Sequence, residues 1–229
     1  MNVDNKIKEE LPRSDDRPSN DKIGTKMLWC PFAEILSYKM KTQGKYAGGY
    51  PVGAVVHFTA GGSEIRDTMS WGKNQGYAFF GIGRDGKIVQ AHAMNEWGHH
   101  AGTSSWPGLG SSLSSKLVGI EVCAAGRLEK ASDGRYKSWF GKYYGESDVR
   151  HSSSKANIQS GVYHAYTDEQ EDALIRLLLW MKNQAPDVFN IDYVLGHDEI
   201  SPNRKNDPGG ALSMTMPEFR QLLKKRLAA

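Results

Sequence analysis

The sequence predicts an α/β fold, with one domain built on a central, mostly mixed β-sheet flanked by helices. Two kinds of segment alternate along the 229 residues: short apolar runs rich in β-branched residues, and longer segments with the apolar period of a helix. Such interleaving is typical of a sheet covered by helices. The chain length suits a single domain with a substantial core, and the sequence contains no internal repeat.

The N-terminal part of the chain begins with an arm. Residues 1–22 are polar, mixed in charge and proline-bearing, which predicts a flexible arm ahead of a domain at 23–229. Residues 30–40, CPFAEILSYKM, have the apolar spacing of a short helix. A connector rich in glycine and tyrosine then leads into an apolar strand at 53–60.

A helix, a hairpin and a strand are expected next. Residues 63–76 predict a helix that ends at Gly76, because glycine suits a left-handed C-cap. Residues 77–93 contain two β-rich runs separated by Arg-Asp-Gly, where the glycine supplies the positive φ of a hairpin turn. Residues 117–123, LVGIEVC, predict a later strand.

The C-terminal part has the clearest helix signal. Thr167 with Gln170 forms a capping box ahead of a long run with helical apolar spacing. A strand at 193–196 and a helix that opens near Pro217 complete the alternation. Residues 125–166 are rich in glycine, serine and aromatics but lack a long regular period, so we expect a long loop inserted in the domain.

Four aromatic residues of that insertion leave two interpretations open. They either form a wall for glycan or peptide or anchor the loop to the core, and the anchoring interpretation is favoured. These residues are Trp139, Phe140, Tyr143 and Tyr144.

Composition excludes several classes of protein. A hydrophobic fraction of 39% and a charged fraction of 24% are ordinary for a globular domain. No run approaches the roughly 20 apolar residues of a membrane span, and the N-terminus lacks a signal-peptide core, which predicts synthesis in the cytoplasm. A net charge of +3, with its basic C-terminal cluster on a helix face, does not favour nucleic-acid binding. Two distant cysteines provide neither a disulfide framework nor a cysteine zinc site.

The residues 197–209, HDEISPNRKNDPG, concentrate a histidine, an acid and a cation around two prolines. His197 leaves the end of a short strand, and the irregular loop after it lets Asp207 fold back. His57 lies in the apolar strand at 53–60. Two imidazoles and one carboxylate from distant segments form the ligand set that catalytic zinc uses, with the fourth position left for water. Taken singly, His57 fits a core histidine, and Asp207 fits a turn former before proline, equally well.

Four motifs carry a specific resemblance: HFTAGG, GHHAGTSSW, VGIEVC and GHDEISPNRKNDPGG. Their order resembles that of the zinc N-acetylmuramoyl-L-alanine amidases of the amidase-2 family, whose fold includes peptidoglycan-recognition proteins. The resemblance covers about residues 50–227, and the last motif is the most specific. It implies Zn²⁺ as cofactor, with His57, His197 and Asp207 as its ligands. Aspartate rather than cysteine at position 207 is similar to the AmpD-type branch.

The resemblance also implies roles for four further side chains. Lys205 stabilises a tetrahedral oxyanion, and Glu121 passes a proton from water to the leaving amine. Tyr77 aligns with a tyrosine that phage-type amidases use near the zinc water, and the choice between Glu121 and Tyr77 stays open. His100 contacts the muramyl or peptide part of the substrate and is not a ligand. The structural alternatives are an ion pair of Lys205 with a neighbouring carboxylate and of Glu121 with an arginine.

The function expected is hydrolysis of the amide bond between N-acetylmuramic acid and L-alanine. A phage-type endolysin, made in a host cytoplasm and acting on the cell wall, is preferred because of the insertion and the arm. The alternatives are a cytoplasmic amidase that recycles anhydro-muropeptides and a non-catalytic peptidoglycan-recognition module, which the complete ligand set disfavours. The partners expected are peptidoglycan or muropeptides, with no nucleic acid and no membrane span, and the protein is expected to be a monomer.

Overall fold

The computed structural model describes residues 27–229, and the predicted arm at 1–22 lies outside the described residues. At its centre is a six-stranded sheet with the order β1-β4-β3-β7-β2-β13. Its strands are β1 (Glu34–Ile35), β2 (Gly53–Phe58), β3 (Phe80–Ile82), β4 (Ile88–Gln90), β7 (Leu117–Val122) and β13 (Val194–Gly196). The β3–β4 pair is antiparallel and the other pairs of this sheet are parallel, so the predicted mixed sheet is confirmed.

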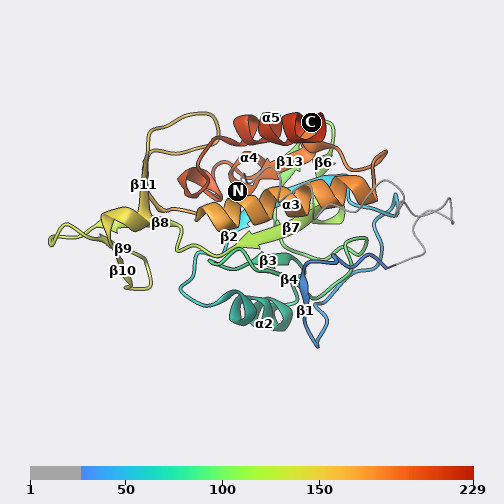
Figure 1. The fold of residues 1–229 in the computed structure, drawn as a ribbon, viewed down its shortest axis with the longest axis horizontal. Helices are drawn as coiled ribbons and strands as arrows, with labels where there is room; N and C mark the ends of the chain where they lie inside the picture. Colours follow the sequence, from blue (N-terminus) through green and yellow to red (C-terminus); the bar gives the residue numbers. More distant parts are fainter. Residues whose placement is uncertain (1–26) are drawn as a thin grey trace.

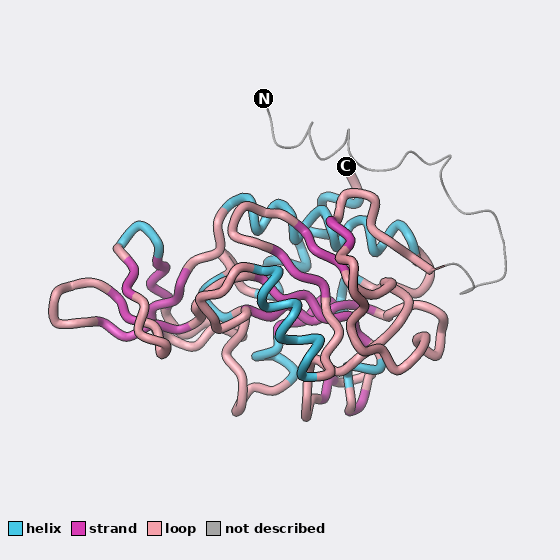
Figure 2. The backbone as a smooth tube through the Cα atoms, turned by 90° about the horizontal axis from the view of Figure 1, so that it is seen from below, coloured by secondary structure: helices cyan, strands magenta, loops and turns pink. Residues whose placement is uncertain are grey.

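Helices cover this sheet. They are α2 (Ile65–Gln75), α3 (Asp168–Gln184), α4 (His197–Ile200) and α5 (Met216–Leu227). Helix α3 crosses the sheet in front of β2 and β7, while α5 lies beside β13 and α2 beside β3 (Figure 1), and Figure 2 shows the same arrangement from below. Short 3₁₀ turns lie at η2 (Leu113–Ser115), η3 (Glu146–Asp148), η4 (Ile191–Tyr193) and η5 (Gly209–Ala211). Within residues 27–229, no helix has both the length and the apolar character that a bilayer crossing needs.

The two faces of the sheet have different neighbours because side chains alternate along a strand. Ala54, Val56 and Phe58 of β2 pack into the large core that contains the apolar face of α3. Val55 instead belongs to a separate cluster with Leu195 on the opposite face. The odd-numbered residues of β2 therefore point away from α3, and this alternation decides where the polar residues of β2 lie.

Local signals in the sequence explain the element ends. Thr167 Oγ1 accepts a hydrogen bond from Gln170 N, and the Gln170 side chain accepts one from Thr167 N, which confirms the capping box of α3. Gly76 ends α2 with a φ of 80°, as predicted for a left-handed C-cap. Gly86 has a φ of 75° in the turn between β3 and β4, which confirms the hairpin.

The helix predicted at residues 30–40 is wrong. Glu34–Ile35 form the edge strand β1, which pairs in parallel with β4. The N–H groups of Leu36 and Met40 continue this contact by donating to the carbonyls of Gln90 and Ala91 at 2.9 Å each. Sheet hydrogen bonds over this segment outweigh the weak helical spacing of its apolar residues.

Residues 125–166, predicted to be a long loop, instead carry a second sheet that we call the outer sheet. Its order is β10-β9-β8-β12-β11, all antiparallel. The strands are β8 (Arg127–Lys130), β9 (Tyr136–Lys137), β10 (Tyr143–Tyr144), β11 (Val149–Ser152) and β12 (Gly161–His164). The outer sheet projects to the side of the central sheet (Figure 1) and has its own small core around Leu128, Tyr136 and Tyr144. A short ribbon of β5 (Ser105–Trp106) and β6 (Gly110–Ser111) completes the strands.

Candidate active site

His57 lies on β2, an internal strand between β7 and the edge strand β13. Because Val56 and Phe58 point toward α3, the imidazole projects from the opposite face. It is only 1% exposed. A polar ring in a strand whose residues are all buried needs partners, and these come from another part of the chain.

His197 and Asp207 lie at the two ends of one loop. Strand β13 ends at Gly196, and His197 begins the short helix α4. The amide of Asp198 then donates to the backbone carbonyl of Asp207 at 2.8 Å, which draws the end of the loop back to its start. The sequence-based expectation that Asp207 folds back toward His197 is thus met by a backbone hydrogen bond.

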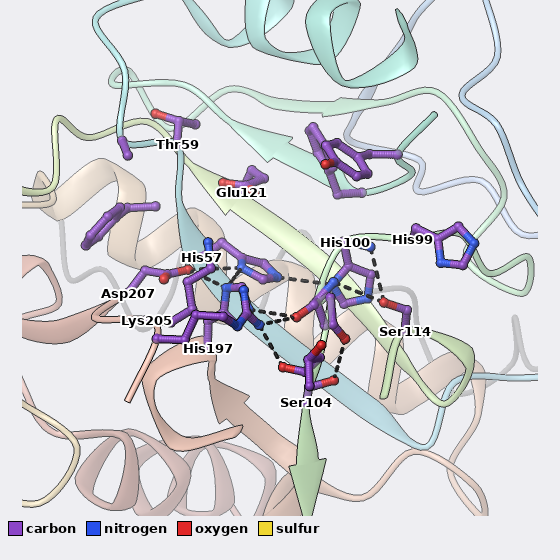
Figure 3. Close-up of a pocket in the computed structure, with 18 of the residues that line it drawn as sticks. His57, Thr59, His99, His100, Ser104, Ser114, Glu121, His197, Lys205 and Asp207 are labelled. Atoms are coloured by element: carbon purple, nitrogen blue, oxygen red, sulfur yellow. Dashed lines mark hydrogen bonds and ion pairs between the residues drawn. The ribbon is translucent and has the colours of Figure 1, made fainter. Parts of the chain in front are cut away.

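These three side chains converge (Figure 3). The Nδ1 atoms of His57 and His197 are 2.9 Å apart, and each lies 3.0 Å from Asp207 Oδ2. All three residues are buried. Zinc binds such atoms at about 2.0–2.2 Å, so ligand atoms this close can share one ion. The described structure therefore contains a site that could hold a metal.

The imidazoles of His57 and His197 each make a further contact through Nε2, and these contacts fix which ring nitrogen carries the proton. His100 Nε2 lies 2.9 Å from Leu117 O, so it is the donor, and His100 Nδ1 is left as an acceptor for His57 Nε2 at 3.1 Å. His197 Nε2 likewise donates to Ala101 O at 2.9 Å. Both Nδ1 atoms therefore present lone pairs to each other and to a carboxylate. Three electron-pair donors with no proton between them fit a cation.

Arg204 supports this assignment. Its Nη2 donates to Thr103 O at 2.7 Å and to Ala101 O at 2.8 Å. Ser201 Oγ also lies 2.9 Å from this nitrogen, so three oxygens compete for its two hydrogens at shorter distances than His197 Nε2 at 3.3 Å, and His197 keeps its proton for Ala101 O. The sequence analysis did not identify Arg204, because its role depends on carbonyls about a hundred residues away.

The protonation states agree with metal binding. Burial, and after it the neighbouring His197, lower the pKa of His57 to about 4 against the opposing effect of Asp207. For Asp207, burial raises the pKa, but the adjacent His197 and His57 side chains outweigh burial and hold it below its ordinary value. His57 is thus neutral and Asp207 ionised at neutral pH, as metal ligands must be.

Glu121 lies on β7 directly opposite His57 of β2. Its Oε2 is buried and has no hydrogen-bond partner within residues 27–229. Burial raises the pKa of this carboxyl well above its ordinary value, the Asp207 charge raises it further, and Lys205 lowers it. No ion pair with an arginine is found in the described part of the chain, so the structural alternative for Glu121 lacks its partner.

Lys205 lies on the loop before Asp207 and lines the same cavity as Glu121. The two carboxylates that could have paired with it have other partners: Glu199 pairs with Arg220, and Asp198 Oδ2 accepts from Asn157 and from Gly209 N. Among the described residues no ion pair of Lys205 is found. The positive charge of Lys205 lowers the pKa of the Glu121 carboxyl.

The cavity has a volume of about 1020 Å³ and two chemically different walls above the ligand set. One wall is aromatic, with Tyr77 against Trp71 at a centroid distance of 5.8 Å. Tyr77 is 38% exposed, and its ring packs against Trp71 of the same wall. The other wall carries hydroxyl groups, contributed by Thr103, Ser104, Ser111, Ser112 and Ser115. The sequence analysis did not identify this hydroxyl wall, although its serine and threonine run was visible in and after GHHAGTSSW.

His100 lines the cavity and is half-buried. Its ring lies over Gly119 of β7, where an added Cβ would lie 2.6 Å from His100 Cγ. A glycine at this position is therefore required for His100 to reach His57. The placement in the groove agrees with the sequence analysis, while contact with substrate stays a prediction.

The N-acetylmuramoyl-L-alanine amidase family matches residues 47–210, which is most of the chain. The chain belongs to this family. The resemblance found in the four motifs is confirmed, and membership supports peptidoglycan amidase activity. No curated protein matches the amidase significantly.

Solved structures of low sequence identity share the fold of this amidase. A selenomethionine derivative of AmpD is 20% identical with a TM-score of 0.54, covering 85% of this chain and 96% of AmpD. AmiD from E. coli, in complex with anhydro-N-acetylmuramic acid-L-Ala-D-gamma-Glu-L-Lys, is 20% identical with a TM-score of 0.52, covering 77% of this chain and 57% of AmiD. The endolysin LysCS from Clostridium intestinale is 18% identical with a TM-score of 0.50, covering 88% and 98%. The predicted fold class is confirmed.

Proposed function

We propose that this amidase hydrolyses the amide bond between N-acetylmuramic acid and L-alanine in peptidoglycan, with Zn²⁺ held by His57, His197 and Asp207. The observation that carries the proposal is the convergence of two imidazole lone pairs and one carboxylate at the base of a cavity, in a chain of the amidase family. The donor set is the nitrogen and oxygen set that catalytic zinc uses. A non-catalytic recognition module has no need of these ligands together with the orphaned carboxyl of Glu121.

The chain's own residues supply the proton transfers. Bound zinc polarises the substrate carbonyl and lowers the pKa of water in the site. Glu121 takes a proton from the attacking water as the water oxygen adds to the lactyl carbonyl carbon. When the C–N bond breaks, Glu121 gives that proton to the departing nitrogen of L-alanine, leaving an amine and a carboxylic acid, and the acid then loses the second water proton to solvent. A carboxyl with a raised pKa suits both steps, since it can hold a proton between them.

Three other side chains serve this reaction in the proposal. Lys205 places its cation toward the oxyanion that develops on the attacked carbonyl. His100 keeps His57 in the tautomer whose Nδ1 faces the metal. Tyr77 is proposed as the alternative proton-transfer group, although Glu121 shares the strand position beside His57 and Tyr77 belongs to the aromatic wall.

We propose a phage-type endolysin as the biological setting, acting as a monomer on the cell wall after synthesis in the host cytoplasm. The alternative is a cytoplasmic amidase that recycles anhydro-muropeptides. The two settings differ in substrate size, because an endolysin cuts polymeric wall and a recycling enzyme cuts small soluble fragments. Comparing purified sacculi with soluble anhydro-muropeptides distinguishes them.

The test of the chemistry is product analysis on purified peptidoglycan. We expect the zinc-loaded protein to release new amino groups, identified as N-terminal L-alanine, without new reducing sugar ends. A chelator abolishes release and added zinc restores it. New reducing ends without new amino groups would identify a glycosidase instead. Binding to sacculi without any cleavage, even with zinc, would replace the amidase by the recognition module.

A further inference from the structure

Trp139 is a large apolar side chain that the fold leaves mostly open to solvent. It lies in the turn between β9 and β10 of the outer sheet and is 78% exposed. Its indole N–H donates to the backbone carbonyl of Ala60 at 2.7 Å. Ala60 lines the active-site cavity and follows β2, the strand that carries His57. The exposed ring is therefore attached to the rim of the cavity.

The turn that carries Trp139 is held in place. Phe140 packs edge-to-face on Trp139 at 5.6 Å, and its ring covers Gly62, where an added Cβ would lie 2.7 Å from Phe140 Cε2. Across the turn, Ser138 N donates to Lys142 O and Lys142 N donates to Ser138 Oγ, both at 2.9 Å. Phe140 thus anchors the turn to the rim, as the favoured interpretation of these aromatics predicts. Trp139 is oriented by the same contacts but stays open to solvent.

The position of the ring relates it to the reaction centre. Ala60 is three residues from His57, so its carbonyl lies within about 10 Å of the His57 backbone along the chain. Figure 3 shows Thr59, the residue before Ala60, at the same edge of the cavity as Glu121 and Asp207. A substrate bound at the ligand set that extended past Thr59 would meet the indole ring next.

The surroundings indicate what the ring binds. Lys137 and Lys142 flank the turn, with their Nζ atoms 5.6 Å and 5.5 Å from the ring centroids of Tyr143 and Tyr144. Among residues 27–229 neither lysine forms an ion pair, whereas Arg135 is paired with Asp133. A flat apolar face on a turn whose lysines are not neutralised by carboxylates suits a molecule that offers both the C–H face of a pyranose ring and carboxylates. One ring with few apolar neighbours is too small for a stable protein interface. A glycan strand bearing acidic peptide stems combines the two features.

We propose that Trp139 is a carbohydrate-stacking platform that extends the cavity to a further saccharide, so that the substrate is a polymeric glycan strand rather than a single muropeptide. This inference rests on the proposed amidase function. It predicts that the platform contributes to polymer binding and not to the chemistry at the metal site. Loss of an aromatic contact of this kind weakens binding by about threefold to tenfold.

The experiment compares cleavage of sacculi with cleavage of monomeric disaccharide muropeptides by zinc-loaded protein. The variants are Trp139→Ala, Trp139→Phe, which keeps a flat ring, and Ile35→Ala, an exposed apolar residue on the distant edge strand β1. Co-sedimentation of chelated protein with sacculi is a second readout that needs no turnover, and thermal unfolding checks that each variant folds. We expect Trp139→Ala to lose threefold to tenfold in kcat/KM and in retention on sacculi only. Trp139→Phe keeps a ring but loses the N–H that holds it to Ala60 O, so we expect it to fall between Trp139→Ala and wild type on sacculi. Ile35→Ala stays within about twofold of wild type on both substrates.

Each other result overturns one of the two ideas. If Trp139→Ala cleaves both substrates as wild type does, or loses both equally while still folded, the platform is wrong and the amidase function stands. If wild type cleaves neither substrate, the amidase function is wrong, and co-sedimentation still decides the platform. In that case equal retention of wild type and Trp139→Ala on sacculi overturns the platform, and weaker retention of Trp139→Ala supports the platform.

Discussion

His57 and Glu121 are direct neighbours on the parallel strands β2 and β7, and both project from the face of the sheet that α3 leaves uncovered. Parallel pairing brings the same ends of the two strands together. The proposed ligand and the proposed proton carrier therefore come from two adjacent strands of the central sheet. Their separation is set by strand spacing and not by a loop.

Glu121→Gln keeps the shape of the side chain and removes its ability to carry a proton. We expect kcat to fall about 10²-fold to 10⁴-fold, as for loss of a general acid–base group. Zinc content, measured by elemental analysis, stays at the wild-type value because Glu121 is not a ligand in the proposal. The matched comparison is Tyr77→Phe, which removes only a hydroxyl from the aromatic wall. A larger loss in Tyr77→Phe than in Glu121→Gln would reverse their roles.

Lys205→Ala removes the cation that faces the reaction centre. We expect kcat to fall about 10²-fold to 10³-fold, the typical effect of losing one oxyanion donor. Zinc affinity changes little, since Lys205 does not contact the ligand atoms in the described structure. Lys225→Ala, on the solvent side of α5, is the control and keeps wild-type kcat. An unchanged kcat in Lys205→Ala would contradict the oxyanion role.

His100→Phe removes the acceptor that holds His57 Nε2–H while retaining a ring over Gly119. Partners of this kind typically account for about 10-fold to 100-fold in metal affinity. We expect zinc affinity, from competition with a chelating dye, to fall by that amount and kcat to recover largely at saturating zinc. His99→Phe changes the neighbouring exposed histidine and leaves zinc affinity unchanged. Equal zinc affinity in both variants would show that His57 is oriented by other contacts.

The sequence predicted those features that depend on local chemistry. The Thr167–Gln170 capping box and the Gly76 C-cap each use residues within one turn of a helix. The meeting of His197 with Asp207 follows from one short loop. The proximity of His57 to them required only that parallel strands end at the same edge of the sheet.

The features that were missed depend on contacts between distant segments. Glu34–Ile35, within the helix predicted at residues 30–40, form an edge strand because β4 supplies partners 55 positions away. The outer sheet was not predicted because strands of two to four residues are too short to show a period of two. Arg204 and His100 act through backbone carbonyls of Ala101, Thr103 and Leu117, and no side-chain motif reports which carbonyls a fold brings near.

His92 gives a prediction for stability at acid pH that does not involve the metal site. Its ring is buried against Phe80, and its Nδ1 has no partner within the described residues. Burial lowers its pKa from 6.5 to about 4. His92 of the unfolded chain therefore binds a proton near pH 6.5, while His92 of the folded chain does not. The free energy of unfolding keeps the full contribution of neutral His92 above that pH and loses it as the pH drops toward 4. Between pH 6.5 and pH 4, this one histidine lowers the free energy of unfolding by roughly 3 kcal/mol.

Denaturant unfolding of wild type and His92→Leu between pH 7 and pH 4.5 measures this effect in the presence of chelator. We expect the unfolding free energy of wild type to fall more steeply with decreasing pH than that of His92→Leu, because the variant has lost one proton-binding site of the unfolded state. Ile35→Ala is the control, since it replaces an exposed apolar residue, changes no titratable group and keeps the wild-type pH slope. Parallel pH profiles for wild type and His92→Leu would mean that the buried ring accepts its proton without opening the core.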